Sequence, residues 1–193
     1  VPPENFDQIR ADYPDELHVA PTLGVYYYGF NMTRAPFADN PELRQALSMA
    51  IDREVLVEAI TGRGEAPAYS WVPPGVDNYD PVQLPYAELS QQERNAIAQS
   101  LYRKAGYSKD NPLRFELRYN TSDTQQRIAL AVQAMWRNVL GAQAQTVNVE
   151  FQVLLDQMRE REITQAFRAS WFGDYNDANS FLAIMQFFFP FVL

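Results

Sequence analysis

The sequence contains no cysteine and only one histidine, His18, among its 193 residues. The lack of cysteine excludes disulfides, thiolate catalysis and cysteine-ligated metals, and a single histidine supplies neither a metal cluster nor a nucleophile–base pair. We therefore expect no cofactor and no metal. Basic residues are in the minority, because the net charge is −8, and such a surface repels phosphate backbones. We expect no nucleic-acid partner, and every apolar run is shorter than the roughly 18 residues of a membrane-spanning helix.

Apolar and aromatic residues are plentiful, at 47% and 13% of the chain, which is enough for a real core. Strand-like alternation and helical spacing then divide the chain into elements. The expected strands are 22–32, 113–119, 146–153 and 164–172, and the expected helices are 2–12, 41–50, 52–60, 90–105, 122–140 and 154–162. From residue 113 onward strands and helices alternate, which predicts a layered α/β lobe.

Helix starts and turns give further signals. Residues that can cap a helix precede four of the expected helices: Asn40, Asp52, Ser90 and Ser122. Ser90 with Glu93 and Ser122 with Gln125 have the spacing of a capping box. Residues 61–89 are rich in proline and glycine but also carry tyrosines and a tryptophan, so we expect an ordered surface loop held by buried aromatic rings.

Five blocks occur in a fixed order at 25–54, 64–75, 93–107, 117–143 and 167–181. The most specific of them is "PFADNPELRQALSMAIDRE", and the last reads "FRASWFGDYNDANSF". Together they resemble the substrate-binding proteins of peptide ABC transporters, namely the oligopeptide- and murein-peptide-binding branch of solute-binding protein family 5. The resemblance implies an α/β fold of the type II periplasmic-binding-protein kind, with a layered mixed sheet and flanking helices. Complete family members are much longer and consist of two lobes that close on a peptide and are joined by hinge strands. The resemblance therefore implies that this chain is mostly the second lobe, and that this lobe is incomplete.

The resemblance also implies a division of the chain. Residues 1–22 are expected to be a remnant of the first lobe that leads to a hinge, and 23–31 the hinge strand. Residues 32–186 would form a truncated second lobe that binds peptide, and 187–193 an atypical apolar tail. Such a tail at a free end favours burial against the lobe or against another copy, and an altered reading frame is a third interpretation. With association between copies, a homo-oligomer is a further expected partner.

The function implied by the resemblance is capture of oligopeptides for a membrane permease, in the periplasm or on a lipid anchor outside a Gram-positive cell, and not catalysis. Binding any peptide regardless of sequence requires contacts to the parts that all peptides share. These are main-chain N–H and C=O groups, which an exposed strand edge can pair, and a charged amino terminus, which a carboxylate can hold. Variable side chains then occupy hydrated pockets.

The resemblance assigns these tasks to residues of the last block and its surroundings. The expected peptide-binding residues are Asp174, Trp171, Phe172, Ser170, Arg168, Arg159 and Tyr28. Residues 170–172 would pair with the peptide main chain and Asp174 would hold its ammonium group. Arg168 and Arg159 would line polar pockets or meet the terminal carboxylate. Tyr28 lies on the hinge strand. Alternate tyrosines of this strand either pack in the core or face the peptide-binding cleft between the two lobes.

Simpler interpretations of the same residues stay open. Asp174 can be a turn or helix-cap residue, and Trp171 can belong to the core. Arg168 can be a solvated charge at a strand edge. Asp174 with Asp177 is a weak candidate for a catalytic carboxylate pair, since only three positions separate them in a turn. The alternative function from another class is a self-associating structural fragment that binds no peptide usefully.

Overall fold

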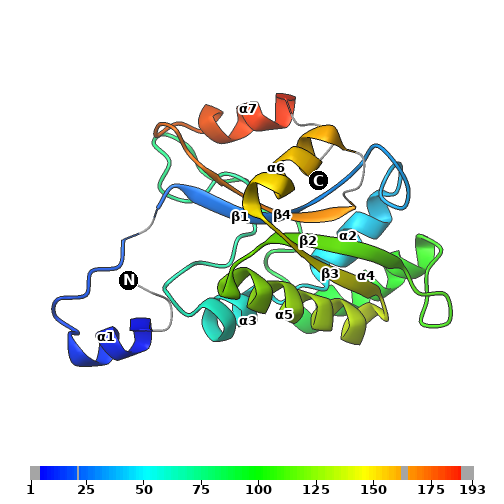
Figure 1. The fold of residues 1–193 in the computed structure, drawn as a ribbon, viewed down its shortest axis with the longest axis horizontal. Coiled ribbons are helices and arrows are strands. Elements are labelled where there is room, and N and C mark those ends of the chain that lie inside the picture. The colour runs from blue at the N-terminus through cyan, green and yellow to red at the C-terminus, as the bar shows by residue number, and fades with distance from the viewer. Residues whose placement is uncertain (1–4, 21, 162–164, 188–193) are drawn as a thin grey trace.

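The computed structural model describes residues 5–20, 22–161 and 165–187, and within them one mixed sheet organises the fold (Figure 1). The strands run in the spatial order β1-β4-β2-β3. Their bounds are β1 (Gly24–Phe30), β2 (Arg114–Asn120), β3 (Gln143–Val149) and β4 (Ala166–Phe172). The layered α/β arrangement predicted from the sequence is therefore present.

Helices cover both faces of this sheet. Their bounds are α1 (Phe6–Asp12), α2 (Pro41–Met49), α3 (Arg53–Val55), the π-helix η2 (Leu56–Thr61), α4 (Gln91–Lys104), α5 (Asp123–Leu140), α6 (Phe151–Glu160) and α7 (Asn179–Phe187). Figure 1 shows α4 and α5 on one side of the sheet and α6 and α7 on the other. Helix α1 lies outside these layers, at the end of an extended segment, and its Arg10 side chain donates to the Gly62 carbonyl at 3.0 Å.

The pairing of β4 changes along its length. On one side β4 pairs with β1 in antiparallel register over the whole strand, from Ala166 opposite Phe30 to Phe172 opposite Gly24. On the other side β4 is parallel to β2, but the register covers only Ala166 and Phe167. In the part of the chain that the structure describes, the second edge of β4 therefore pairs with no strand beyond Phe167.

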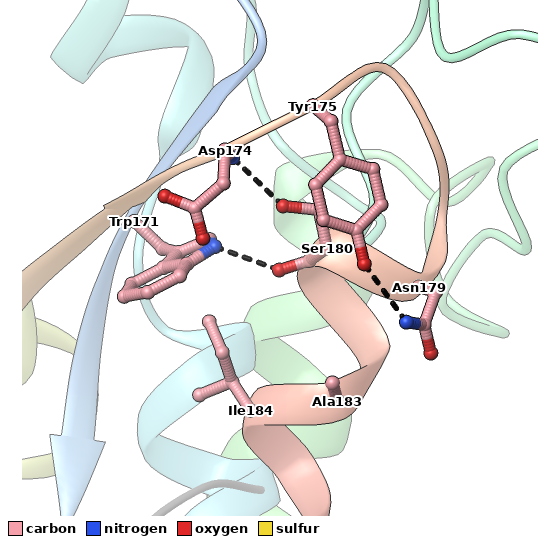
Figure 2. A pocket seen from close by; sticks show the side chains of 7 residues that line it. All are labelled: Trp171, Asp174, Tyr175, Asn179, Ser180, Ala183 and Ile184. Atoms are coloured by element: carbon pink, nitrogen blue, oxygen red, sulfur yellow. Dashed lines mark hydrogen bonds between the residues drawn. The ribbon is translucent and has the colours of Figure 1, made fainter.

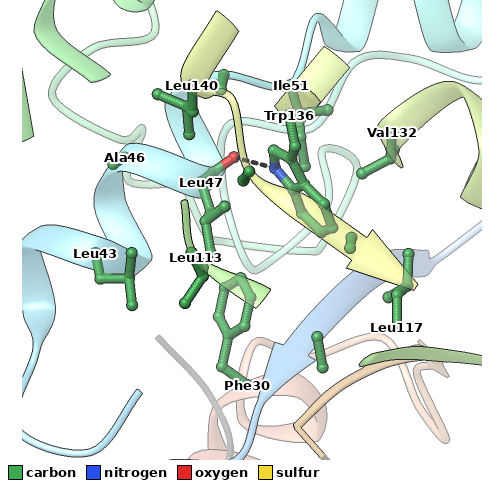
Figure 3. Close-up of a cluster of buried hydrophobic side chains, with 14 of the residues drawn as sticks. Phe30, Leu43, Ala46, Leu47, Ile51, Leu113, Leu117, Val132, Trp136 and Leu140 are labelled. Carbon is green, nitrogen blue, oxygen red and sulfur yellow. Dashed lines mark hydrogen bonds between the residues drawn. The ribbon is translucent and has the colours of Figure 1, made fainter. Parts of the chain in front are cut away.

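The main core lies between the sheet and helices α2, α4 and α5 (Figure 3). Trp136 of α5 is fully buried there, and its indole Nε1 donates to the Leu47 carbonyl at 2.8 Å. Its ring lies near those of Phe115 and Tyr28, with centroid separations of 5.3 and 6.2 Å. A smaller cluster packs on the opposite face of the sheet, around Leu154 and Phe167.

The segment between η2 and α4 is an ordered loop held by aromatic side chains, as predicted. Tyr69 and Tyr86 are buried in it. The Tyr69 hydroxyl donates to Glu54 at 2.7 Å and accepts from the buried Arg94 guanidinium, which also pairs with Glu54 at 3.1 Å. This polar cluster connects the loop to α3 and α4.

Several predicted helix starts are confirmed. The Asn40 side chain accepts from the Leu43 N–H, and Ser90 with Glu93 forms a complete capping box. Asp52 also caps its helix, but only three residues are α-helical before the chain continues as a π-helix that ends at Thr61, followed by the left-handed Gly62.

Two predictions about local structure were wrong. Ser122 makes no side-chain cap at α5, and the Gln125 side chain accepts a hydrogen bond from the Tyr26 hydroxyl at 2.9 Å. The strand expected over 146–153 ends at Val149, since the Glu150 side chain accepts from two main-chain N–H groups and begins α6 at Phe151. Residues 188–193 of the expected apolar tail lie outside the described residues.

Candidate functional site

The free edge of β4 presents main-chain groups from alternate residues. Towards β1, the Gly173 N–H donates to the Leu23 carbonyl at 2.9 Å, and the Gln165 carbonyl accepts from Asn31 at 2.8 Å. Main-chain groups of successive strand residues point to opposite edges. The N–H and C=O groups of residues 168, 170 and 172 therefore point to the edge that β2 leaves open after Phe167.

Asp174 lies just beyond the carboxyl end of this edge. Its own N–H donates to the hydroxyl of the buried Ser180 at 2.8 Å, which fixes the main chain of the turn (Figure 2). The side chain is exposed. Among the described residues, no hydrogen-bond donor or cation contacts its carboxylate, so Asp174 is not an internal helix cap here.

A pocket of about 420 Å³ adjoins the Asp174 carboxylate (Figure 2). Its lining residues are Trp171, Asp174, Tyr175, Asn179, Ser180, Ala183 and Ile184. Trp171 and the first turns of α7 supply the apolar wall, and Asp174 supplies the negative charge. A cationic group on an apolar body, such as the amino terminus of a peptide, matches this combination.

Two tryptophans hold α7 against this pocket. The Trp171 indole donates to the Ser180 carbonyl and the Trp71 indole to the Phe181 carbonyl, each at 2.8 Å. Phe181 is itself fully buried. Trp171 is therefore both a core residue that anchors α7 and a wall of the pocket.

Arg168 occupies the other face of β4, opposite Tyr28 of β1. Its guanidinium donates to Asn120 Oδ1 at 3.1 Å and to Ser170 Oγ at 3.2 Å, and it lies 5.2 Å from the centre of the Tyr26 ring. Burial raises the pKa of both tyrosines, and the arginine charge partly opposes this. No carboxylate of the described chain pairs with Arg168, and its side chain is half-buried.

The other predicted site residues lie differently. Arg159 is on α6, where its side chain is 77% exposed and pairs with Asp156 at 3.5 Å. No described contact brings it to Asp174 or Arg168. Tyr28 packs edge-on against Tyr26 within the sheet face that α5 covers. The Asp177 carboxylate accepts from the Asn179 N–H at 2.7 Å, which is a turn role and not that of a catalytic partner.

Three residues of the site were missed by the sequence reasoning. Ser180 holds the Asp174 turn, Trp71 anchors α7, and Asn120 orients Arg168. Ser180 lies within the recognised last block, so its short polar side chain before a buried phenylalanine was a usable signal. Trp71 was expected only as an aromatic anchor of the loop 61–89, and Asn120 was given no role, although both lie within recognised blocks.

The described residues contain no group of three or more His, Cys, Asp or Glu side chains placed to hold a metal ion. None of the described helices is both long and apolar enough to cross a membrane.

The sequence matches the model of a known family, the bacterial extracellular solute-binding proteins, family 5 Middle, over residues 1–188. It is 39% identical over 184 residues to the periplasmic murein peptide-binding protein MppA of Escherichia coli, which covers 95% of this chain and 34% of MppA. It is also 39% identical over 185 residues to the periplasmic oligopeptide-binding protein OppA of Salmonella typhimurium, covering 96% of this chain and 34% of OppA.

Solved structures give the same result. The E. coli murein tripeptide binding protein MppA superposes with a TM-score of 0.88 at 38% identity, over 95% of this chain and 36% of that one. Haemophilus influenzae OppA in complex with RPPGFSPFR gives 0.84 at 33% identity, over 94% and 36%. The chain thus spans about a third of the length of the relatives it matches.

Proposed function

Because the chain belongs to the family 5 extracellular solute-binding proteins of bacteria, we propose that it forms part of the peptide-binding cleft of a peptide ABC transporter's binding component. The family membership and the partial periplasmic-binding-protein-like α/β fold agree with the resemblance seen in the sequence. The family consists of binding proteins and not enzymes. The named relatives are periplasmic, and we propose the same compartment here, with a lipid anchor as the Gram-positive variant.

The mechanism we propose is addition of a peptide strand to the open edge of β4. The observation that carries it is an exposed carboxylate, without a partner among the described residues, directly beyond a strand edge that is free from residue 168 to 172. An amino terminus held by Asp174 places the start of the peptide at the carboxyl end of β4. The peptide therefore runs antiparallel to β4, and its main chain gains ladder hydrogen bonds whatever its sequence.

The direction of the open-edge groups then sets the register. With the first peptide residue opposite Phe172, its ammonium group can donate to the Phe172 carbonyl and to the Asp174 carboxylate at the same time. The third residue then lies opposite Ser170 and the fifth opposite Arg168, because opposed residues advance together along an antiparallel pair. The Arg168 guanidinium would donate hydrogen bonds to the terminal carboxylate of a peptide that ends near it.

The strength of the Asp174 contact depends on its exposure. In water, two opposite charges about 4 Å apart attract by roughly 1 kcal/mol, which corresponds to about fivefold in affinity. The Asp174 side chain is exposed in this chain, so the value of roughly 1 kcal/mol for charges in water applies. Burial of the same pair by a second lobe would make removal of one partner cost roughly 3–5 kcal/mol.

The test is a titration of the ¹⁵N-labelled chain with tri-alanine, followed by amide chemical shifts. Asp174→Asn should weaken binding about fivefold, because it removes the charge and keeps the shape. N-acetyl tri-alanine, which lacks the ammonium group, should bind the unaltered chain and the variant equally weakly. Asp177→Asn is the matched control, since it removes the same charge three residues away, and it should leave the affinity unchanged. Equal affinity of the Asp174→Asn variant and the unaltered chain for tri-alanine would overturn the proposed site.

We also propose that residues 23–31 act as a hinge strand between 1–22 and the lobe formed by 32–186. The position of α1 outside the two helix layers supports this division (Figure 1), and the hydrogen bond from Arg10 to the Gly62 carbonyl links α1 to the lobe. A permease is the proposed partner of the complete binding protein. Self-association through the apolar tail is the alternative function. Light scattering with and without tri-alanine would distinguish peptide binding from self-association. A dimer whose mass does not change on addition of the peptide, and that binds no peptide, would favour self-association.

A further inference from the structure

Phe172 is the last residue of β4, and this residue is 62% exposed. It lies on the same face of the strand as Ser170 and Arg168, because side chains alternate along β4. Its cross-strand neighbour on β1 is Gly24. A Cβ built on Gly24 would lie 2.7 Å from Phe172 Cδ1, so the ring rests over the space that this glycine leaves empty.

The proposed register puts the first peptide residue opposite Phe172 on the open side. In an antiparallel pair, residues directly opposite each other carry their side chains on the same face, with Cα atoms about 5.5 Å apart when they exchange hydrogen bonds. The first side chain of the peptide therefore lies beside the exposed part of the Phe172 ring. The second side chain points to the opposite face, where Trp171 and the α7 pocket lie.

We propose that Phe172 makes this chain select peptides whose first residue has a large apolar or aromatic side chain. The inference rests on the proposed peptide function and on its register. Contact between two apolar side chains removes both from water, whereas a small or hydroxyl side chain at that position gains little from the ring. Cross-strand aromatic and apolar pairs change a binding constant by up to about fivefold.

The same register predicts no such selection at the third position. There the neighbour on β4 is Ser170, whose small side chain already accepts from Arg168 at 3.2 Å. Selectivity confined to the first position is therefore the specific signature of Phe172, and a general preference for apolar peptides is not.

The experiment titrates the ¹⁵N-labelled 193-residue chain with Phe-Ala-Ala, Ser-Ala-Ala and Ala-Phe-Ala. The unaltered chain should bind Phe-Ala-Ala about fivefold more tightly than Ser-Ala-Ala. Phe172→Ser should reduce that ratio to about one, and Phe172→Leu should keep most of it, because Leu retains an apolar surface. Phe172→Ser should weaken the binding of Ala-Phe-Ala far less than that of Phe-Ala-Ala, since the aromatic ring of Ala-Phe-Ala lies on the other face. Because Phe172 is exposed, we expect the Phe172→Ser and Phe172→Leu variants to fold like the unaltered chain. Comparison of the amide spectra of the three proteins checks this.

The outcomes separate this inference from the proposed function. The role of Phe172 is overturned if the Phe172→Ser variant still binds Phe-Ala-Ala more tightly than Ser-Ala-Ala. It is also overturned if the substitution weakens the binding of Ala-Phe-Ala as much as that of Phe-Ala-Ala. If tri-alanine binding depends on Asp174 but no first-residue preference exists, the inference fails and the proposed function stands. If no peptide binds in an Asp174-dependent way, both fail together.

Discussion

Trp136→Phe is expected to destabilise the chain strongly, because it perturbs the centre of the main core. Trp136 is fully buried, and its indole donates to the Leu47 carbonyl at 2.8 Å. Leu47 lies in the last turn of α2, where carbonyl groups lack the donor that a longer helix would provide. The indole therefore satisfies a buried acceptor that phenylalanine would leave without a partner.

The magnitude follows from two costs. A buried polar group that loses its partner costs about 1–3 kcal/mol, and the volume left by the second ring of the indole adds about 1 kcal/mol. The sum is a loss of about 2–4 kcal/mol in the free energy of unfolding. Urea denaturation followed by circular dichroism measures this loss, and an unchanged dependence on urea would show that the surface exposed on unfolding is the same.

Trp171→Phe is the matched control. Its indole also donates to a helix carbonyl at 2.8 Å, that of Ser180, but the residue is only half-buried at the edge of the α7 pocket. Water can replace the lost donor there, so the expected cost is about 1 kcal/mol. Equal losses for the two variants, or a loss below about 1 kcal/mol for Trp136→Phe, would contradict the reasoning that burial sets the cost.

Two other predictions concern the ionisation of Tyr69 and the contact between Arg168 and the terminal carboxylate of a peptide. Burial and the hydrogen bond to Glu54 raise the pKa of Tyr69 to about 12. Because the pKa of this tyrosine is raised above its usual 10, its stabilising contribution is complete below pH 10 and is lost as the pH rises through 12. Tyr69→Phe should therefore flatten the alkaline decline in the free energy of unfolding, and an identical decline in both proteins would contradict this. Separately, Arg168→Gln should weaken binding of penta-alanine about threefold to fivefold but leave binding of its C-terminal amide unchanged, as measured by the same amide titration. An equal effect on both peptides would remove Arg168 from the carboxylate site.

Local signals in the sequence predicted much of the fold. The start of α2 at Asn40 and the capping box at Ser90 depend on residues three positions apart, so they form wherever the helix forms. The predicted box at Ser122 is not formed, and the Gln125 side chain contacts Tyr26, 99 positions away, which no local pattern indicates. The boundary between β3 and α6 was misplaced because alternation of apolar residues continues past Glu150, whose capping role depends on its side-chain conformation.

The candidate site could be predicted only where its residues follow one another in the sequence. Residues 170 to 174 form one run, so the strand and the carboxylate beyond it were expected together. The open edge depends on where β4 separates from β2, which is a property of pairing between distant segments. The same holds for Arg168, which Asn120 orients from 48 positions away, and for Arg159, which α6 turns to solvent. Neither contact leaves a pattern in the neighbouring sequence.

The exchange rates of the β4 amide protons test the central claim most directly. The N–H groups of Ser170 and Phe172 point to the open edge, whereas those of Ala169 and Trp171 are directed to β1. When tri-alanine occupies nine-tenths of the chain, exchange at Ser170 and Phe172 should slow about tenfold, with Ala169 and Trp171 unaffected. Unchanged exchange at Ser170 and Phe172 in the presence of bound peptide would contradict strand addition at this edge.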